Sequence, residues 1–286
     1  MKLLLKTSTE FLTLLLLVLT VFLTGCQTFP VGERIAEIEK DYQYSIYPDI
    51  SVKGLYLYYE MCRAAWRQRD SWKDSGWDLR FFHDEKTDTL GVFILEDEIL
   101  YISFRSSRAI LKDSVDLSYN SRIGLMPLPF LPESGIKAHR GFIEKYMSVR
   151  DIILQELVDS NPKEIILVGH SAGGAMASLA FIDIKHLYPD TPLNAVTFGM
   201  PRVFNSEGAR WYSTYRDNLI RVVNGRDLIP HMPSVLFGYR HVGRLVRIGI
   251  RPWWKIYSIK DHHPGYSDQL EDLLRLEGID FTTLGY

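Results

Sequence analysis

Residues 164–187 constrain the fold most, because they require a strand, a sharp turn and a helix in immediate succession. Residues 164–168 form a continuous apolar run, as expected of a strand that is covered on both faces. The helix pattern at 172–187 is rich in small residues, which allow a helix to pack close to a strand. Ser171 stands in the turn between Gly169 and Gly173, where a tight backbone leaves no room for side chains.

The same turn has the pattern Gly-x-Ser-x-Gly. Between a buried strand and a helix, this pattern is typical of the nucleophile elbow of α/β-hydrolases. The alternative is a glycine-rich phosphate loop, but such a loop needs Gly-Lys-Ser/Thr and the turn contains no lysine. Ser171 is therefore the candidate nucleophile.

The remaining chain alternates strand and helix patterns, which predicts an α/β fold with a mainly parallel central sheet flanked by helices. No internal repeat or linker divides it, so we expect one domain over residues 51–286. Helices are predicted at 52–67, 142–158 and 266–276, and strands at 77–82, 89–95, 99–104, 193–198 and 219–223. A further alternating strand pattern spans 239–248 and contains His241, which we interpret as a structural histidine.

The N-terminus has the layout of a secretory signal. Lys2 and Lys6 precede an apolar run at 11–23 that is short for a membrane span, although an uncleaved anchor helix is the alternative. The run ends in Leu23-Thr24-Gly25-Cys26, which resembles the lipobox of bacterial lipoproteins. The resemblance implies a signal peptide at 1–25, a lipid on Cys26 and a tether at 26–50.

Residue Gln27 follows the lipobox cysteine, at the place where Asp would suggest retention in the inner membrane. The resemblance therefore implies a membrane-anchored lipoprotein of the bacterial outer membrane or cell surface. The only other cysteine in the sequence is Cys62, so the chain has no disulfide framework. A formal net charge of −2 gives no basic footprint for nucleic acid.

A serine nucleophile needs a base, and the base needs an orienting carboxylate. In α/β-hydrolases the chain order is serine, acid, histidine. Asp227 fits because it follows the predicted strand at 219–223, at the edge where such sheets carry their sites. The base is predicted in Asp261-His262-His263-Pro264, and His231 is the next candidate. Adjacent histidines also suggest a metal site, but no third ligand stands at a recognisable spacing.

Four separated segments resemble the class 3 lipases, the family that includes the filamentous-fungal triacylglycerol lipases. They are the elbow around Ser171, Phe198-Gly199-Met200-Pro201-Arg202, the segment 221–230 with Asp227, and Phe104-Arg105-Ser106-Ser107. The family usually has Leu in place of Ala172 and Gly in place of Ser106.

The resemblance implies a Ser171–His262–Asp227 triad that cleaves acyl esters of lipids, with no metal and no organic cofactor. It also implies an oxyanion hole made by Ser107 and Ala172. Asp261-His262 matches the family's dipeptide at the base, while counting back from Tyr266 favours His263 as the alternative base.

The family's lid corresponds to residues 108–117 and 118–122. The proline-rich stretch 124–132 is an acyl-binding wall, a lid or a surface loop, and 250–255 is a second apolar candidate. A different class of function also fits the sequence, namely a surface lipoprotein that uses the hydrolase fold as a binding or structural module.

Overall fold

A computed structural model of the chain describes residues 51–66, 77–107, 115–249 and 257–280, all of them within one compact unit. The signal peptide, Cys26 and the tether predicted for residues 1–50 lie outside these ranges. So do most of the predicted lid, at 108–114, and the tryptophan pair at 253–254.

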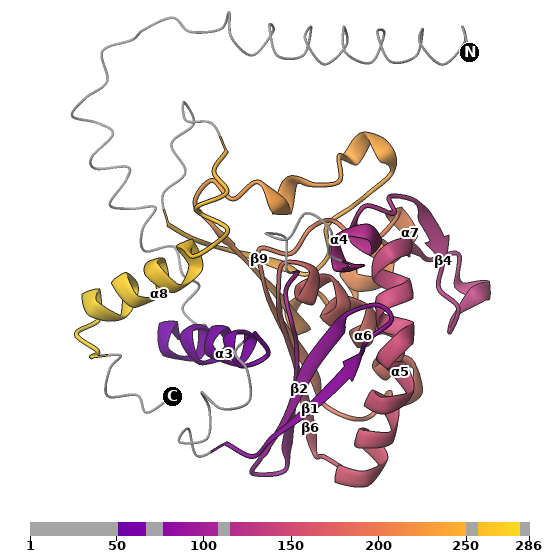
Figure 1. The fold of residues 1–286 in the computed structure, drawn as a ribbon, viewed down its shortest axis with the longest axis horizontal. Helices are drawn as coiled ribbons and strands as arrows, with labels where there is room; N and C mark the ends of the chain where they lie inside the picture. Colours follow the sequence, from indigo (N-terminus) through magenta and orange to yellow (C-terminus); the bar gives the residue numbers. More distant parts are fainter. Residues whose placement is uncertain (1–50, 67–76, 108–114, 250–256, 281–286) are drawn as a thin grey trace, which may run out of the picture. The chain divides into compact units, whose positions relative to one another are not determined.

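A seven-stranded sheet in the order β1-β2-β3-β6-β7-β8-β9 forms the centre of the fold (Figure 1). The pairs β1–β2 and β2–β3 are antiparallel, and every later neighbour is parallel. The prediction of a mainly parallel α/β sheet is thus confirmed. The strands span Leu79–Asp84, Thr89–Glu96, Ile99–Phe104, Glu164–His170, Leu193–Phe198, Leu219–Asn224 and Arg244–Ile248.

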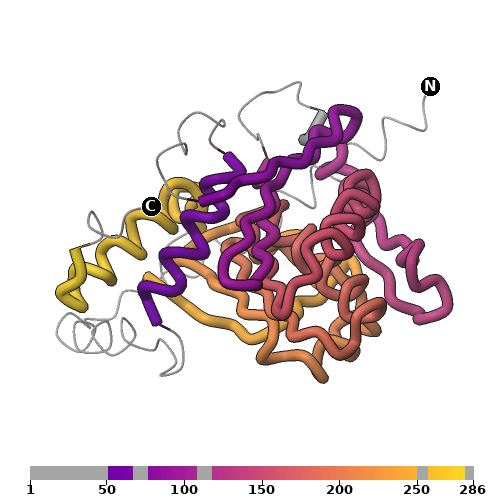
Figure 2. The backbone as a smooth tube through the Cα atoms, turned by 90° about the horizontal axis from the view of Figure 1, so that it is seen from below, coloured from indigo at the N-terminus to yellow at the C-terminus, as the bar shows by residue number. Residues whose placement is uncertain are grey.

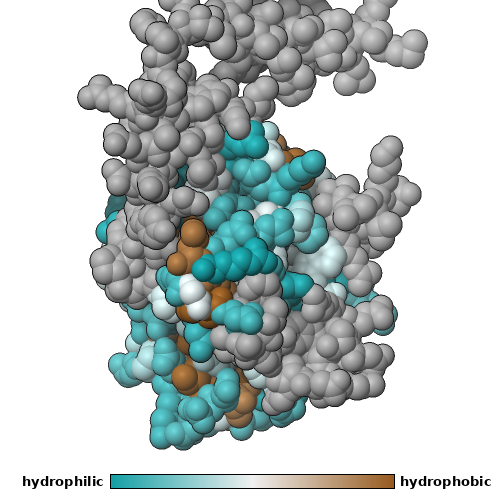
Figure 3. All heavy atoms as spheres, turned by 90° about the vertical axis from the view of Figure 1, so that its left-hand side faces the viewer, coloured by the Kyte–Doolittle hydropathy of each residue, from teal (hydrophilic) through white to brown (hydrophobic). Residues whose placement is uncertain are grey.

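Helices cover both faces of this sheet. Helices α3 (Val52–Ala64) and α8 (Gly265–Leu276) lie side by side on one face, and α5 (Arg140–Ser160) and α6 (Ala172–Leu187) cover the other (Figures 1 and 2). Each face buries its own apolar cluster. The outer surface on the α3 and α8 side is mostly hydrophilic, with small separate apolar patches (Figure 3). None of the described helices is long and apolar enough to span a membrane.

Several smaller elements were not predicted from the sequence. They are the helix α7 (Ser206–Ser213) and a hairpin of β4 (Leu125–Pro127) with β5 (Lys137–His139). The short helix α4 (Val115–Asn120) lies within the stretch 108–122 that was expected to correspond to the family's lid. The proline-rich stretch 124–132 enters the β4–β5 hairpin. Its Leu128 is fully buried in the main core, and Phe130 packs against Tyr146.

One strand was predicted too long. The alternating pattern at 239–248 suggested a single strand that contained His241, but β9 starts only at Arg244. Gly243 explains the difference, because its φ of +76° turns the chain, and a Cβ there would lie 2.4 Å from the carbonyl O of Leu219. His241 therefore lies in a loop, where its Nε2 contacts the carbonyl O of Pro230.

Backbone-to-backbone contact fixes the start of α6. A Cβ on Gly173 would lie 2.2 Å from the carbonyl O of Phe104 at the end of β3. A Cβ on Gly169 would lie 2.3 Å from the backbone of Gly173. Side chains are thus excluded where β3, β6 and α6 meet, which is the physical reason for both glycines of the motif.

We expect Gly173→Ala to destabilise the protein by about 1–3 kcal/mol, because the new methyl group overpacks rigid backbone. Gly124→Ala is the matched control, since a Cβ at Gly124 would meet nothing within 4 Å. Urea unfolding of both variants measures the difference. Equal stabilities for the two variants would show that the contact at Gly173 does not constrain the fold.

Candidate active site

Ser171 lies between the last residue of β6 and the first residue of α6. Its backbone has φ 57° and ψ −124°, a strained conformation for a residue with a side chain. Its N–H donates to the carbonyl O of Phe198 at 2.8 Å, which ties the turn to the end of β7. The strain holds the hydroxyl above the carboxyl ends of the parallel strands.

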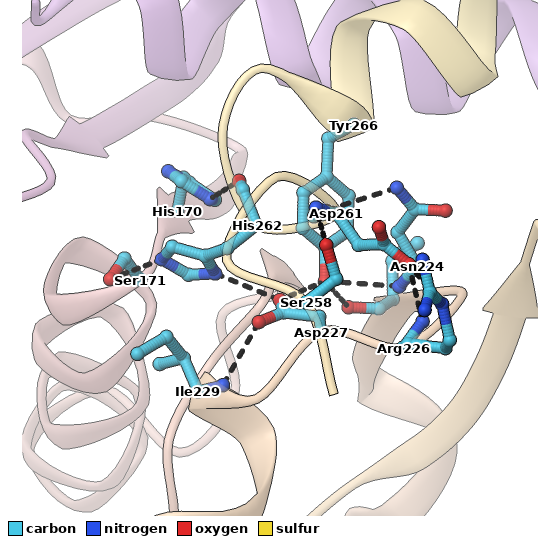
Figure 4. A network of polar contacts seen from close by, with 11 residues as sticks. His170, Ser171, Asn224, Arg226, Asp227, Ile229, Ser258, Asp261, His262 and Tyr266 are labelled. Carbon is cyan, nitrogen blue, oxygen red and sulfur yellow. Dashed lines mark hydrogen bonds and ion pairs between the residues drawn. The ribbon is translucent and has the colours of Figure 1, made fainter. Parts of the chain in front are cut away.

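His262 links this hydroxyl to a buried carboxylate (Figure 4). Its Nε2 lies 2.9 Å from Ser171 Oγ, and its Nδ1 lies 2.8 Å from Asp227 Oδ2. An ionised carboxylate only accepts hydrogen bonds, so Nδ1 is the donor and Nε2 is left to accept the serine proton. The structure therefore brings together Ser171, His262 and Asp227.

Asp227 is 1% exposed and its carboxylate receives two further donors. The N–H of Ile229 donates to Oδ1 at 2.9 Å, and the hydroxyl of Tyr266 donates to Oδ2 at 2.8 Å. Three hydrogen bonds compensate the burial of this charge. Tyr266 served in the sequence only as a landmark at the start of the last helix, and its contact with Asp227 needed the structure.

Three hydrogen bonds connect the loop that carries His262 to the loop that carries Asp227 (Figure 4). Ser258 N–H donates to the carbonyl O of Arg226 at 2.9 Å, and Arg226 N–H donates to Asp261 Oδ2 at 2.7 Å. The side-chain amide of Asn224 donates to the carbonyl O of Asp261 at 3.0 Å. These contacts hold the His262 imidazole beside the Asp227 carboxylate, in addition to the hydrogen bond between the two groups.

His170, beside the nucleophile, also holds this loop. Its Nε2 lies 3.1 Å from the carbonyl O of His262, and the two imidazole rings are 4.5 Å apart. Burial lowers the pKa of His170 well below the usual value, and the nearby His262 and His263 act in the same direction. His170 is therefore neutral at pH 7 and donates one hydrogen bond to the loop that carries His262.

The neighbouring His263 faces a different partner. Its ring stacks on Trp66, with centroids 6.2 Å apart and an interplanar angle of 11°. The two adjacent imidazoles therefore serve different contacts, and it is His262 that lies between Ser171 and Asp227. Within the described residues no three His, Cys, Asp or Glu side chains gather as a metal site.

Ser107 and Ala172, expected at the oxyanion hole, both line a cavity of about 560 Å³ together with Ser171 and His262. Ala172 is the first residue of α6, where backbone N–H groups lack partners within the helix. The side-chain amide of Asn120 donates to Ser107 Oγ at 2.5 Å. The hydroxyl proton of Ser107 is thus left for another acceptor, and nothing in the sequence pointed to Asn120.

The other walls of the cavity are largely apolar. They include Phe142, Pro201, Ile229, Met232, Pro233 and Ile259. His139 also lines it, and burial lowers the pKa of this histidine to about 4, so its ring is uncharged at pH 7. None of the described residues 124–132 lines the cavity, so the proline-rich stretch packs against the core instead of forming an acyl-binding wall.

The sheet, the strained serine and the Ser-His-Asp arrangement define an α/β-hydrolase with the geometry of a serine hydrolase. The family model described as Lipase (class 3) matches residues 101–237, the range that contains Ser107, Ser171 and Asp227. This part of the chain is similar to the class 3 lipases.

Known relatives agree with this assignment. The chain is 30% identical over 154 residues to a lipase of Rhizomucor miehei, covering 51% of this chain and 41% of that one. It is 33% identical over 164 residues to the secreted mono- and diacylglycerol lipase A of Penicillium camembertii, covering 54% and 50%. The chain thus spans about half the length of these curated relatives or less.

Among solved structures, the lipase of Rhizopus microsporus var. chinensis superposes with a TM-score of 0.57 at 26% identity. The match covers 69% of this chain and 74% of that one. The likeness therefore extends over most of the described fold, well beyond the motif around Ser171.

We expect Tyr266→Phe to lower kcat about tenfold with little change in KM, because a hydrogen bond to a buried carboxylate contributes about 1.5–3 kcal/mol. Tyr212→Phe is the control, as its equally buried hydroxyl donates to the carbonyl O of Ser178, away from the triad. Steady-state kinetics and thermal unfolding of both variants separate catalysis from stability. A wild-type kcat for Tyr266→Phe would contradict the role given to this hydroxyl.

Proposed function

We propose that the protein hydrolyses acyl esters of lipids, as a lipase or phospholipase, through a serine acyl-enzyme. The observation that carries the proposal is the continuous chain from Ser171 Oγ through His262 to Asp227, open to a largely apolar cavity. An apolar cavity of this size suits an acyl chain. The class 3 lipase relatives support the same chemistry.

The geometry leads to the following mechanism. His262 Nε2 takes the hydroxyl proton as Ser171 Oγ attacks the ester carbonyl, and Asp227 stabilises the imidazolium that forms. The N–H groups of Ala172 and Ser107, with the Ser107 hydroxyl, bind the developing oxyanion; one such donor contributes a factor of about 10²–10³ in rate. His262 then protonates the leaving alcohol, and water releases the acid from Ser171 by the same path.

The direct test of this function is Ser171→Ala, measured on a panel from short-chain nitrophenyl esters to emulsified glycerides and phospholipids. We expect hydrolysis of every substrate to fall at least 10³-fold, because the nucleophile is lost, while the thermal unfolding temperature stays near that of the wild type. Residual turnover above a few per cent would exclude Ser171 as nucleophile. The panel also identifies the preferred head group and acyl length.

The two adjacent histidines should differ sharply on substitution. His262→Ala removes the group that contacts both Ser171 and Asp227, so we expect a loss in kcat on the order of 10³-fold or more. His263→Ala removes only the ring stacked on Trp66 and should change kcat modestly. Equal, mild losses in kcat for both variants would place the base elsewhere, with His231 next in line.

We further propose that the chain is a bacterial lipoprotein attached to a membrane through Cys26, on the basis of the lipobox resemblance. Cys26→Ser should then release the protein from membranes and leave its specific activity unchanged, because the cysteine precedes the domain expected over residues 51–286. Cell fractionation, combined with mass spectrometry of the N-terminal peptide, measures both effects. An unmodified Cys26 in the mature wild-type protein would refute the proposal.

A further inference from the structure

The loop between β8 and β9 exposes large apolar side chains to solvent. Leu236 is 90% exposed and Phe237 is 68% exposed, and the nearby Met232 and Val235 are each about half exposed. Single exposed apolar residues are ordinary on protein surfaces, but four within six residues form a patch that marks an interaction site. We call residues 232–237 the apolar loop.

The apolar loop has a defined structure despite its exposure. Residues Val235–Phe237 form one 3₁₀ turn, in which Ser234 Oγ accepts from Leu236 N–H at 3.2 Å. Gly238 closes the turn with φ 85°. At the base, the Arg202 guanidinium donates to the carbonyl oxygens of Pro233 and His231. The fold therefore presents these apolar side chains to solvent on a fixed frame.

The loop is continuous with the mouth of the cavity beside Ser171. Met232 and Pro233 belong to both the loop and the cavity wall. Trp66, Ile123 and Ile259 also line the cavity and are 39%, 59% and 59% exposed. Figure 1 shows the segment between β8 and β9 in orange, at the same end of the sheet as α4. Apolar side chains from separate segments thus surround one opening.

The foot of the loop carries a positive charge. Arg240 is exposed, and its guanidinium donates to the carbonyl O of Val235 at 3.1 Å. An apolar tip with a cation behind it is the arrangement that suits the boundary between acyl chains and anionic headgroups. A water-soluble protein partner would call for more polar groups around the tip than Leu236 and Phe237 provide.

We propose that the apolar loop docks on the phospholipid bilayer that holds the chain's own lipid anchor, so that the cavity takes its substrate from that membrane. The inference rests on the proposed function and on lipidation of Cys26. The 24 residues between Cys26 and Ser51 let the two ends lie at most about 85 Å apart when extended, which keeps the domain close to that surface. Docking through the loop turns the cavity mouth toward the lipids.

Fluorescence tests the insertion without any turnover. Mature lipidated Ser171→Ala protein is reconstituted into phosphatidylethanolamine–phosphatidylglycerol vesicles, with an environment-sensitive dye on Leu236→Cys. Val158→Cys in α5, where the native side chain is 63% exposed and does not line the cavity, is the matched control. Cys62 is buried and Cys26 is lipidated, so the introduced thiol takes the label.

We expect the dye at 236 to shift to shorter wavelength and to be quenched by spin-labelled lipid, and the dye at 158 to do neither. Equal responses at the two positions, or none at 236, would overturn the docking surface. A mature protein without lipid on Cys26 would overturn it as well.

Activity in the same vesicles tests the consequence. With the native serine, Leu236→Ser/Phe237→Ser should reduce hydrolysis of a fluorogenic phospholipid in the vesicle at least tenfold. The same variant should hydrolyse a water-soluble nitrophenyl ester within twofold of the wild-type rate, and Val158→Ser should leave both rates unchanged. Parallel loss on both substrates, or loss of vesicle hydrolysis in Val158→Ser, would overturn the inference. If the wild-type protein cleaves only the soluble ester, docking on the membrane is contradicted and the proposed ester hydrolysis is not. If it cleaves neither substrate, the proposed function itself is contradicted.

Discussion

The site depends on one close contact, the packing of the start of α6 against the ends of β3 and β6. Gly173 lies against the carbonyl O of Phe104, and Gly169 lies against Gly173, at distances that no side chain permits. This contact forces Ser171 into its strained conformation and places α6 directly below the hydroxyl. It also brings the end of β3, which leads into Ser107, next to the first turn of α6.

A second constraint is the buried charge of Asp227. Such a charge is tolerated only with full hydrogen bonding, and here the donors come from His262, Ile229 and Tyr266. Loss of any one donor leaves part of the buried negative charge of Asp227 without a hydrogen bond. The same need to compensate the charge thus fixes the tautomer of His262, because Nδ1 must donate and Nε2 must accept. The same contacts therefore stabilise the folded state and prepare His262 to accept a proton.

Much of the fold was predictable because its signals are local. The apolar run at 164–168 and the small-residue helix fixed the elbow, and the order of motifs along the chain was enough to select Asp227. The rest depends on distant contacts. Nothing local shows that Asn120 contacts Ser107, or that Tyr266 reaches Asp227.

Sequence pattern favoured His262 over the adjacent His263 without excluding the latter, and only their contacts with Asp227 and Trp66 distinguish the two. The strand predicted at 239–248 was too long for a related reason. Its polar–apolar alternation is real, but Gly243 turns the chain to pass Leu219. Alternation along a sequence cannot show where a neighbouring backbone forces a turn.

The proposed activity requires that the fold makes Ser171 a nucleophile. A fluorophosphonate probe tests it most directly, because the probe reacts covalently with a serine whose proton is removed by a neighbouring base and needs no knowledge of the substrate. Intact-mass spectrometry of the folded protein, followed by peptide mapping, measures the adduct. We expect one adduct, on Ser171, which disappears on prior heat unfolding. A folded protein that stays unlabelled, or one labelled at another serine, would contradict it and favour a hydrolase fold used only for binding.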